Sequence, residues 1–163
     1  MDISRLQLPG LEELPMSLNH LGYLTDDIDA AIAAYSAIGM TQVNRFDSSI
    51  SVVAFGLMPF SPADGSGGTH PALRIELTMP TQPGNRFSDR LAEYGPGIDH
   101  FGISVPDFEQ YLDKLVAAGC IMTVDMRKSV IGTDGLASTH AGLEACFLDC
   151  DAIGFPNVEM FGP

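Results

Sequence analysis

Two stretches of the chain carry the same pattern of apolar and polar positions. Residues 18–40 align with residues 98–120 without a gap. The apolar positions agree along the two stretches, and five pairs are identical: His20/His100, Gly22/Gly102, Asp27/Asp107, Ala37/Ala117 and Gly39/Gly119. Identities placed on a shared apolar pattern predict an internal duplication.

Each copy predicts a strand followed by a helix. A short strand of apolar and β-branched residues carries the histidine, and an acidic turn then supplies side-chain oxygens for a helix N-terminus. Apolar residues recur next at helical spacing, and a glycine follows where a left-handed cap is expected. The apolar helix positions are Ile28, Ala31, Ile32 and Tyr35 in the first copy and Phe108, Tyr111, Leu112 and Leu115 in the second.

Strand patterns follow each helix. The first copy offers MTQVNRF, ISVVAFGL and ALRIELTM, the second offers IMTVDMR, LEACFLDC and NVEMFG, and NRFSDRLAEYG between the copies predicts a short helix. The fold class expected is α+β, with two βαβββ modules that form curved mixed sheets around a metal-binding cleft. The expected organisation is an N-terminal extension (1–16), a first module (17–84), a linker helix (85–96) and a second module (97–163) in one domain overall.

Composition and charge exclude several classes of protein. An apolar fraction of 45% and a charged fraction of 18% are typical of a globular chain. A net charge of −13 with eight scattered basic residues argues against nucleic acid as a partner. The apolar runs are too short to span a membrane, and the acidic, proline-containing start is unlike a signal peptide, so we expect a cytoplasmic protein. Three cysteines without CxxC spacing predict idle, buried thiols.

The candidate chemistry lies in two histidines and two glutamates. A lone histidine on an apolar strand is usually structural, but His20 and His100 occupy equivalent positions. Glu76 and Glu159 each interrupt the last apolar strand of a module. The bland alternative places both glutamates on solvated sheet faces, whereas burial would demand a compensating partner. Repetition in both copies favours a shared metal site.

The donor set indicates which metal and which chemistry to expect. Two imidazoles and two carboxylates suit Ni, Co, Fe, Mn or Zn at a six-coordinate site with two open positions. Closed structural zinc sites instead favour thiolates. Open positions predict Lewis-acid catalysis.

The chain resembles the vicinal oxygen chelate superfamily, which includes glyoxalase I, methylmalonyl-CoA epimerase, extradiol dioxygenases and metal-free drug-binding proteins. The resemblance covers nearly the whole chain from Ser17 onward, and the segment ending in GIDHFGISV looks most like the epimerases. It implies that His20, Glu76, His100 and Glu159 are the metal ligands. Superfamily members form such sites within one chain or across a dimer, and we expect a homodimer here.

Further site residues follow from the same resemblance. Epimerases of this kind use two carboxylate bases, and Asp47 is the only carboxylate in the matching segment NRFDSSISVVAF. The turn THAGLEACFL resembles a glycine-rich epimerase turn and places His140 at its histidine, as a candidate substrate-binding residue, whereas His70 is interpreted as a surface residue. Arg127 and Lys128 end a predicted strand, and Arg127 is a candidate contact for a substrate carboxylate, as is Arg74, which shares a strand face with Glu76.

The function expected is therefore a metal-dependent isomerase, epimerase or lyase. It would chelate two neighbouring oxygens of a small carbonyl or carboxylate substrate, including an acyl-CoA, and move a proton through an enolate-like intermediate, with Glu159 and Asp47 as the catalytic residues. Three alternatives stay open: a glyoxalase I-like lactoylglutathione lyase, an extradiol-type dioxygenase and a metal-free small-molecule binding protein.

Overall fold

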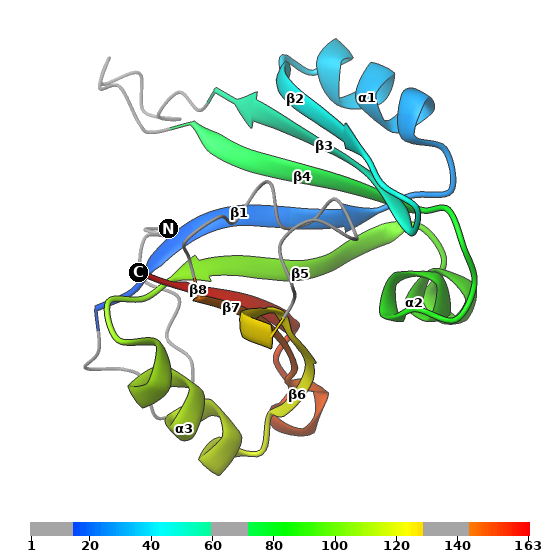
Figure 1. Ribbon diagram of the computed structural model, residues 1–163. Coiled ribbons are helices and arrows are strands. Elements are labelled where there is room, and N and C mark those ends of the chain that lie inside the picture. Colours follow the sequence, from blue (N-terminus) through cyan, green and yellow to red (C-terminus); the bar gives the residue numbers. More distant parts are fainter. Residues whose placement is uncertain (1–14, 60–71, 129–143) are drawn as a thin grey trace. The chain divides into compact units, whose positions relative to one another are not determined.

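A computed structural model describes residues 15–59, 72–128 and 144–163, apart from the side chains of residues 42 and 43. Eight strands and three α-helices lie in these residues, with two short 3₁₀ helices (Figure 1). The strands are β1 (Ser17–Leu24), β2 (Thr41–Asp47), β3 (Ser51–Met58), β4 (Leu73–Pro80), β5 (Gly97–Ser104), β6 (Ile121–Asp125), β7 (Glu144–Asp149) and β8 (Asn157–Gly162). The helices are α1 (Ile28–Ala37), α2 (Arg86–Tyr94), α3 (Phe108–Ala118), η1 (Met126–Lys128) and η2 (Asp151–Ile153).

Helices α1 and α3 begin and end at the residues that the sequence indicates. Asp27 accepts a hydrogen bond from the Ala30 amide at 2.9 Å, and Asp107 accepts one from the Gln110 amide at 3.0 Å. Each carboxylate thereby satisfies an amide that the first helical turn leaves without a partner. After the last turn, Gly119 has a φ of 112° and Gly39 a φ of 105°. Only glycine adopts these angles without strain, so both chain reversals require it.

The chain forms two compact units, which we call the N-terminal and C-terminal units. The N-terminal unit comprises His20–Ile98, and the C-terminal unit comprises Asp99–Pro163 with the described residues that precede His20. Within the C-terminal unit, the Tyr111 hydroxyl donates a hydrogen bond to the Pro15 carbonyl and holds this preceding segment to α3.

The N-terminal unit packs α1 against a four-stranded sheet in the order β2-β3-β4-β1. Strand β1 runs parallel to β4, and the remaining pairs are antiparallel. The core lies between the helix and the sheet and contains Ile28, Ala31, Met40, Val52, Ala54, Ile75 and Leu77, with Ile32 and Tyr35 half-buried at its margin. The predicted apolar face of residues 28–35 is therefore the face that the helix buries.

The C-terminal unit repeats this arrangement with the order β5-β8-β7-β6 and with α3 over the sheet. Strand β5 runs parallel to β8, and the other pairs are antiparallel. Its larger core includes all four apolar residues predicted for α3: Phe108, Tyr111, Leu112 and Leu115. The predicted α+β fold with βαβββ modules is confirmed, whereas the predicted module boundaries stay predictions.

Irregularities of the two sheets also fall at matching places. The β2–β3 register shifts between Gln42 and Asn44, and the β6–β7 register shifts between Met122 and Val124. One detail of the sequence prediction is wrong: the strand predicted for residues 121–127 ends at Asp125, and Arg127 lies in η1. The Asp125 carboxylate accepts a hydrogen bond from the Arg127 amide at 3.2 Å, a side-chain turn that competes with the sheet.

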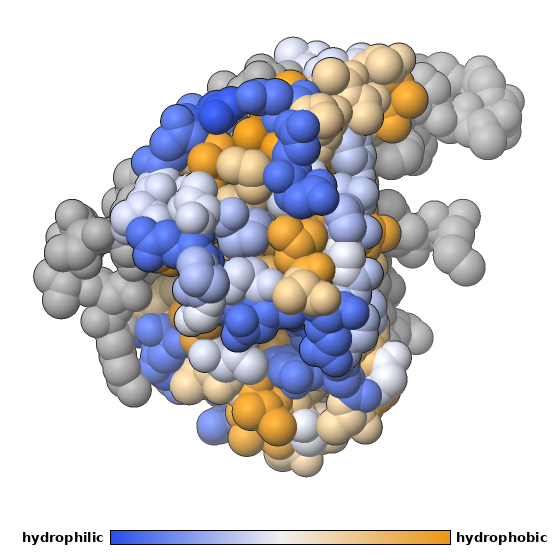
Figure 2. Space-filling view, turned by 90° about the vertical axis from the view of Figure 1, so that its right-hand side faces the viewer, coloured by the Kyte–Doolittle hydropathy of each residue, from blue (hydrophilic) through white to orange (hydrophobic). Residues whose placement is uncertain are grey.

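The helix predicted between the two copies is α2, and a reciprocal cap fixes its start. Asn85 accepts hydrogen bonds from the Phe87 and Ser88 amides, and the Ser88 hydroxyl in turn accepts one from the Asn85 amide. Figure 2 shows hydrophobic residues in separate groups between hydrophilic ones on one face of the molecule, as is usual for a protein surface. In the described part of the chain, every helix is too short or too polar to cross a bilayer.

Candidate metal centre

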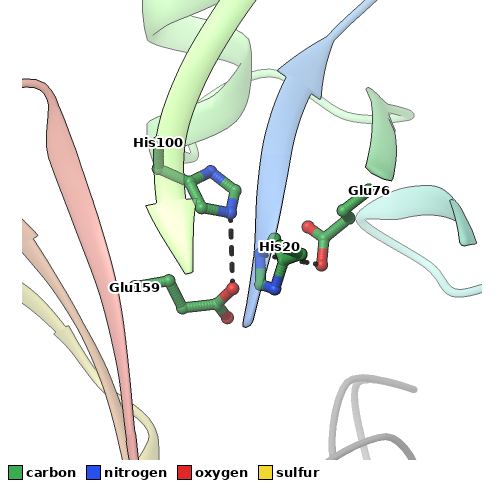
Figure 3. Close-up of side chains that lie close together, drawn as sticks. All are labelled: His20, Glu76, His100 and Glu159. Carbon is green, nitrogen blue, oxygen red and sulfur yellow. Dashed lines mark ion pairs between the residues drawn. The ribbon is translucent and has the colours of Figure 1, made fainter. Parts of the chain in front are cut away.

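In the N-terminal unit, His20 on β1 faces Glu76 on β4. The distance from His20 Nε2 to Glu76 Oε2 is 3.6 Å (Figure 3). The parallel pairing of the strands sets this contact, because it places Gly22, two residues after the histidine, opposite Glu76. Alternation along β1 returns residues 20 and 22 to the same face of the sheet. The predicted histidine and glutamate of this unit therefore meet.

In the C-terminal unit, His100 on β5 faces Glu159 on β8 in the same way. The distance from His100 Nε2 to Glu159 Oε2 is 3.3 Å (Figure 3). Here Gly102 lies opposite Glu159 in the parallel register, as Gly22 lies opposite Glu76. The same strand pairing thus creates the same His–Glu contact twice.

All four side chains are buried, with exposed fractions of 1% for each histidine, 5% for Glu76 and 2% for Glu159. The alternative of glutamates on a solvated sheet face is therefore wrong. A buried carboxylate is stable only with a charged, hydrogen-bonding or metal partner. Each of the four offers one ligand atom, and imidazole with carboxylate suits a divalent transition metal. The chemistry of this donor set fits the ion that the sequence predicts.

A phenylalanine accompanies each His–Glu pair, which the sequence alone did not reveal. Phe55 lies opposite Glu76 in the β3–β4 pairing, and Phe147 lies opposite Glu159 in the β7–β8 pairing. Their rings meet the histidine rings nearly at right angles, with centroids 6.3 Å apart for His20 and 5.1 Å apart for His100. Apolar neighbours of this kind lower the local dielectric, which strengthens electrostatic interactions between buried polar groups.

Two polar neighbours distinguish the pairs, and sequence reasoning missed both. In the N-terminal unit the Thr78 hydroxyl donates a hydrogen bond to Glu76 Oε1 at 3.1 Å. In the C-terminal unit Asp99 Oδ2 lies 2.8 Å from His100 Nδ1. The period-two alternation of β4 was the available signal for Thr78, since residues 76 and 78 share a face. For Asp99 the signal was weaker, because adjacent residues of a strand normally point to opposite faces.

Asp47, the predicted second base, lies at the end of β2 and is exposed. Its carboxylate accepts a hydrogen bond from Arg45 Nε at 3.1 Å, and Arg45 also contacts Asp29 at 2.8 Å. These hydrogen bonds, first that to Asp47, raise the pKa of the Arg45 guanidinium. Asp47 therefore belongs to an exposed ion-pair network on the N-terminal unit.

Arg127, the predicted substrate contact, is bound to carboxylates of its own unit. Its guanidinium donates two hydrogen bonds to Asp125, at 2.9 and 3.1 Å, and one to Glu109 at 2.5 Å. It also lies over the Phe108 ring, 5.1 Å from the centroid. The hydrogen bonds to Asp125 raise the pKa of the guanidinium. A substrate anion would have to compete with two carboxylates for this arginine.

The remaining candidates divide between described and undescribed residues. Arg74 is exposed and lies over the ring of Phe55, 4.5 Å from the centroid, which connects it to the wall beside His20. Lys128 ends η1. His140 and His70 lie outside the described residues.

The three cysteines are buried and free, as the sequence predicts. Burial raises the thiol pKa of Cys120 and Cys150, and it raises the pKa of Cys146 to about 12. A thiol is reactive only as the thiolate, so these side chains serve packing.

Known structures of similar fold include several epimerases. A variant of Streptomyces coelicolor methylmalonyl-CoA epimerase in complex with 2-nitronate-propionyl-CoA superposes with a TM-score of 0.65 at 19% identity, covering 92% of this chain and 98% of that one. Methylmalonyl-CoA epimerase from Mycobacterium tuberculosis gives 0.60 at 21% identity, with coverages of 90% and 87%. A hypothetical protein from Bacillus halodurans gives 0.64 at 18% identity, with coverages of 91% and 94%. At these identities the likeness concerns the fold.

The chain has no match among curated proteins. Its family is nevertheless shown by the sequence itself, because one family model matches residues 19–137, the greater part of the chain. With that match and the duplicated βαβββ architecture, the chain belongs to the Glyoxalase/Bleomycin resistance protein/Dioxygenase superfamily.

Proposed function

We propose that the protein is a metal-dependent epimerase or related isomerase that moves a proton at the carbon beside a carbonyl. In this proposal His20, Glu76, His100 and Glu159 together hold one divalent ion of Ni, Co, Mn, Fe or Zn. The observation that carries it is the repetition of one buried His–Glu contact, in the same register, in both units. Four-ligand binding would leave open positions for two neighbouring oxygens of a substrate. The ion, when bound, supplies Lewis-acid polarisation of the substrate carbonyl.

The residues of the chain then divide the remaining tasks. Glu159 removes the proton from one face of the carbon through a carboxylate oxygen, and the second carrier protonates the opposite face, while Phe147 beside Glu159 keeps water from the reacting carbon. Glu76 stays in place because the Thr78 hydroxyl holds its second oxygen. Inverting a carbon needs a proton carrier on each face, and we propose Asp47 for the second. Its ion pair with Arg45, at 3.1 Å, fixes the position of this carboxylate at the end of β2.

The substrate class that we propose is a small acyl thioester with a carboxylate or second carbonyl nearby. The similarity to methylmalonyl-CoA epimerases, one of them in complex with methylmalonyl-CoA, supports an acyl-CoA. The net charge of −13 opposes a polyanionic coenzyme at long range, but salt screens that repulsion beyond about 8 Å. A glyoxalase-type thiol hemiacetal would present the same pair of neighbouring oxygens.

Metal titration tests whether the four residues form one site. Chelator-treated protein is titrated calorimetrically with Mn²⁺, Co²⁺, Ni²⁺ and Zn²⁺ in turn. We expect one ion per chain, and His20→Ala or His100→Ala should each lower its affinity by at least about 100-fold, more than the loss of an outer-sphere partner. Glu93→Gln on α2, an exposed residue outside the set of four, is the control and should bind normally. Two ions per chain, each lost in a different variant, would contradict the shared site, and no ion at all would favour a metal-free binding protein.

Isotope exchange tests the reaction. The metal-loaded enzyme should exchange the C–H proton of methylmalonyl-CoA for deuterium in D₂O, followed by NMR. The hemithioacetal of methylglyoxal and glutathione is run in parallel, and its conversion in place of exchange would identify the glyoxalase-type reaction. Exchange that persists undiminished in the metal-stripped protein would refute the mechanism.

A further inference from the structure

Asp99 is a buried acid directly beside a proposed metal ligand. Its exposed fraction is 2%, and its Oδ2 lies 2.8 Å from Nδ1 of His100, which is itself 1% exposed. The other ring nitrogen of His100, Nε2, faces Glu159 at 3.3 Å. The imidazole therefore lies between two carboxylates, one at each nitrogen.

The chemistry of the two groups decides where the Nδ1 proton belongs. An ionised carboxylate has only acceptor sites, so an imidazole nitrogen at 2.8 Å from it must be the donor. A hydrogen bond to an ionised group is also stronger than one between neutral groups. With the proton held on Nδ1, the lone pair available for an ion is the one on Nε2.

The geometry points to Asp99 as a positioning residue: it accepts the Nδ1 proton of His100 and thereby commits Nε2 to face Glu159 and the ion. The proton on Nδ1 concerns the protein alone, whereas the commitment of Nε2 to an ion rests on the proposed function. A carboxylate behind a ligating histidine fixes both the tautomer and the ring orientation, and it makes the ligating nitrogen more basic.

His20 follows a residue of a different kind from the one that precedes His100. The residue before His20 is Asn19, whose side-chain amide donates a hydrogen bond to Ser104 Oγ at 2.9 Å. A neutral amide at this position brings no negative charge to the imidazole.

Nitrogen NMR of the metal-free full chain tests the proton assignment. In protein labelled with ¹⁵N-histidine, with His100 assigned through His100→Gln, Nδ1 should give the shift of a protonated nitrogen. Its N–H proton should appear far downfield and exchange slowly with water. Both signatures should be lost in Asp99→Ala and weakened in Asp99→Asn, which keeps an acceptor oxygen but removes the charge. A protonated Nδ1 signal that persists unchanged in Asp99→Ala would overturn the assignment.

Metal affinity tests the consequence. Asp99→Ala should lower the affinity for the metal ion by about 10- to 100-fold, the usual effect of removing a partner behind a ligating histidine. Asp99→Asn should fall between this variant and the wild type, and it is the variant of choice if Asp99→Ala does not fold. Asp113→Asn on α3, exposed and in the same unit, removes one negative charge without touching His100 and should bind as the wild type does.

The two sets of outcomes separate this inference from the proposed function. If the wild type binds no ion but shows the Nδ1 proton held by Asp99, the proposed function fails and the positioning role of Asp99 stands. If the wild type binds one ion and both Asp99 variants bind it equally well, the positioning role fails and the proposed function stands.

Discussion

Each unit contains a His–Glu pair, and a polar neighbour contacts the glutamate in the N-terminal unit but the histidine in the C-terminal unit. In the N-terminal unit a hydroxyl, that of Thr78, holds the glutamate. In the C-terminal unit a carboxylate, that of Asp99, lies against the histidine. Position 161, which follows Glu159 as position 78 follows Glu76, is phenylalanine and offers no hydroxyl.

The two units share the strand register around the His–Glu pair and differ in the polar neighbours of that pair. In both units the parallel register places a glycine opposite the glutamate, and the antiparallel register with the neighbouring strand places a phenylalanine opposite it on the other side. Those positions determine whether histidine and glutamate meet at all. The hydrogen-bonding neighbours act on one member of each pair, the glutamate in one unit and the histidine in the other.

The largest expected difference between the units concerns catalysis. Glu159→Gln should lower the rate of C–H exchange by about 10²- to 10⁴-fold even at saturating metal, because it removes the proton carrier. Glu76→Gln should weaken metal binding but recover most of the rate when the metal concentration is raised. Exchange rates measured across a metal titration separate these cases. Equal, metal-reversible losses in both variants would show that Glu159 is only a ligand.

The second difference concerns packing against the helices. A Cβ added at Gly162 would lie 2.6 Å from Phe108 Cβ, close to the α3 backbone, whereas one added at Gly56 would meet the flexible side chain of Met40. Gly162→Ala should therefore lower the free energy of unfolding by about 1–3 kcal/mol, and Gly56→Ala by less, because Met40 can rotate away. Urea denaturation measures both. A larger loss for Gly56→Ala would reverse the ranking.

The third difference tests the hydroxyl of Thr78, whose counterpart in the C-terminal unit, position 161, is phenylalanine. Thr78→Val keeps the shape of the side chain but removes the donor to Glu76 Oε1. It should lower the affinity for the metal ion by about tenfold, which corresponds to roughly the free energy of one hydrogen bond to a charged group. Thr78→Ser should restore the affinity. Calorimetric titration gives both values, and normal affinity in Thr78→Val would leave the hydroxyl with a structural role only.

The smallest expected effect concerns the thiols, which only the C-terminal unit contains. Burial raises the pKa of Cys146 from its ordinary value of 9.0 to about 12, so the unfolded chain loses this proton first as the pH rises. The contribution of this thiol to the free energy of unfolding is fully present below pH 9. It is lost as the pH rises toward 12, by about 1 kcal/mol between pH 9 and 10. Urea denaturation of the wild type and of Cys146→Ala at several pH values should show a shallower pH slope for the variant. Parallel slopes would mean that the thiol ionises equally in both states.

Local chemistry explains why so much of the fold was predictable. Asp27 and Asp107 cap helices because a carboxylate satisfies amides one turn away, and Gly39 and Gly119 reverse the chain because their φ angles exclude other residues. These rules act within a few residues and are legible in the chain. Arg127 shows their limit: a turn at Asp125 ended a strand that the apolar pattern extended to residue 127.

Partners that lie far apart in the chain were less accessible. The candidate ligands could be predicted because the histidine and the glutamate recur in both copies of the duplicated pattern. They are His20, Glu76, His100 and Glu159. Thr78, Asp99 and the two phenylalanines could not be predicted in this way, because their roles depend on strand register and on side-chain direction at twisted strands. Asp47 and Arg127 were chosen by residue type, and the tertiary structure gives each an ion-pair partner that the sequence did not specify.

The sequence by itself determined the duplication, the α+β class, the capped helices and the four residues of the candidate metal centre. Repetition and local periodicity can be recognised from the order of the residues alone. The tertiary structure alone decided that each glutamate is buried against its histidine and which neighbours hold it. Burial and hydrogen bonding arise from the pairing of β1 with β4 and of β5 with β8, in which the paired residues lie more than 50 positions apart in the chain. The stretch GIDHFGISV contains His100, and the parallel pairing of β5 with β8 brings Glu159 to it.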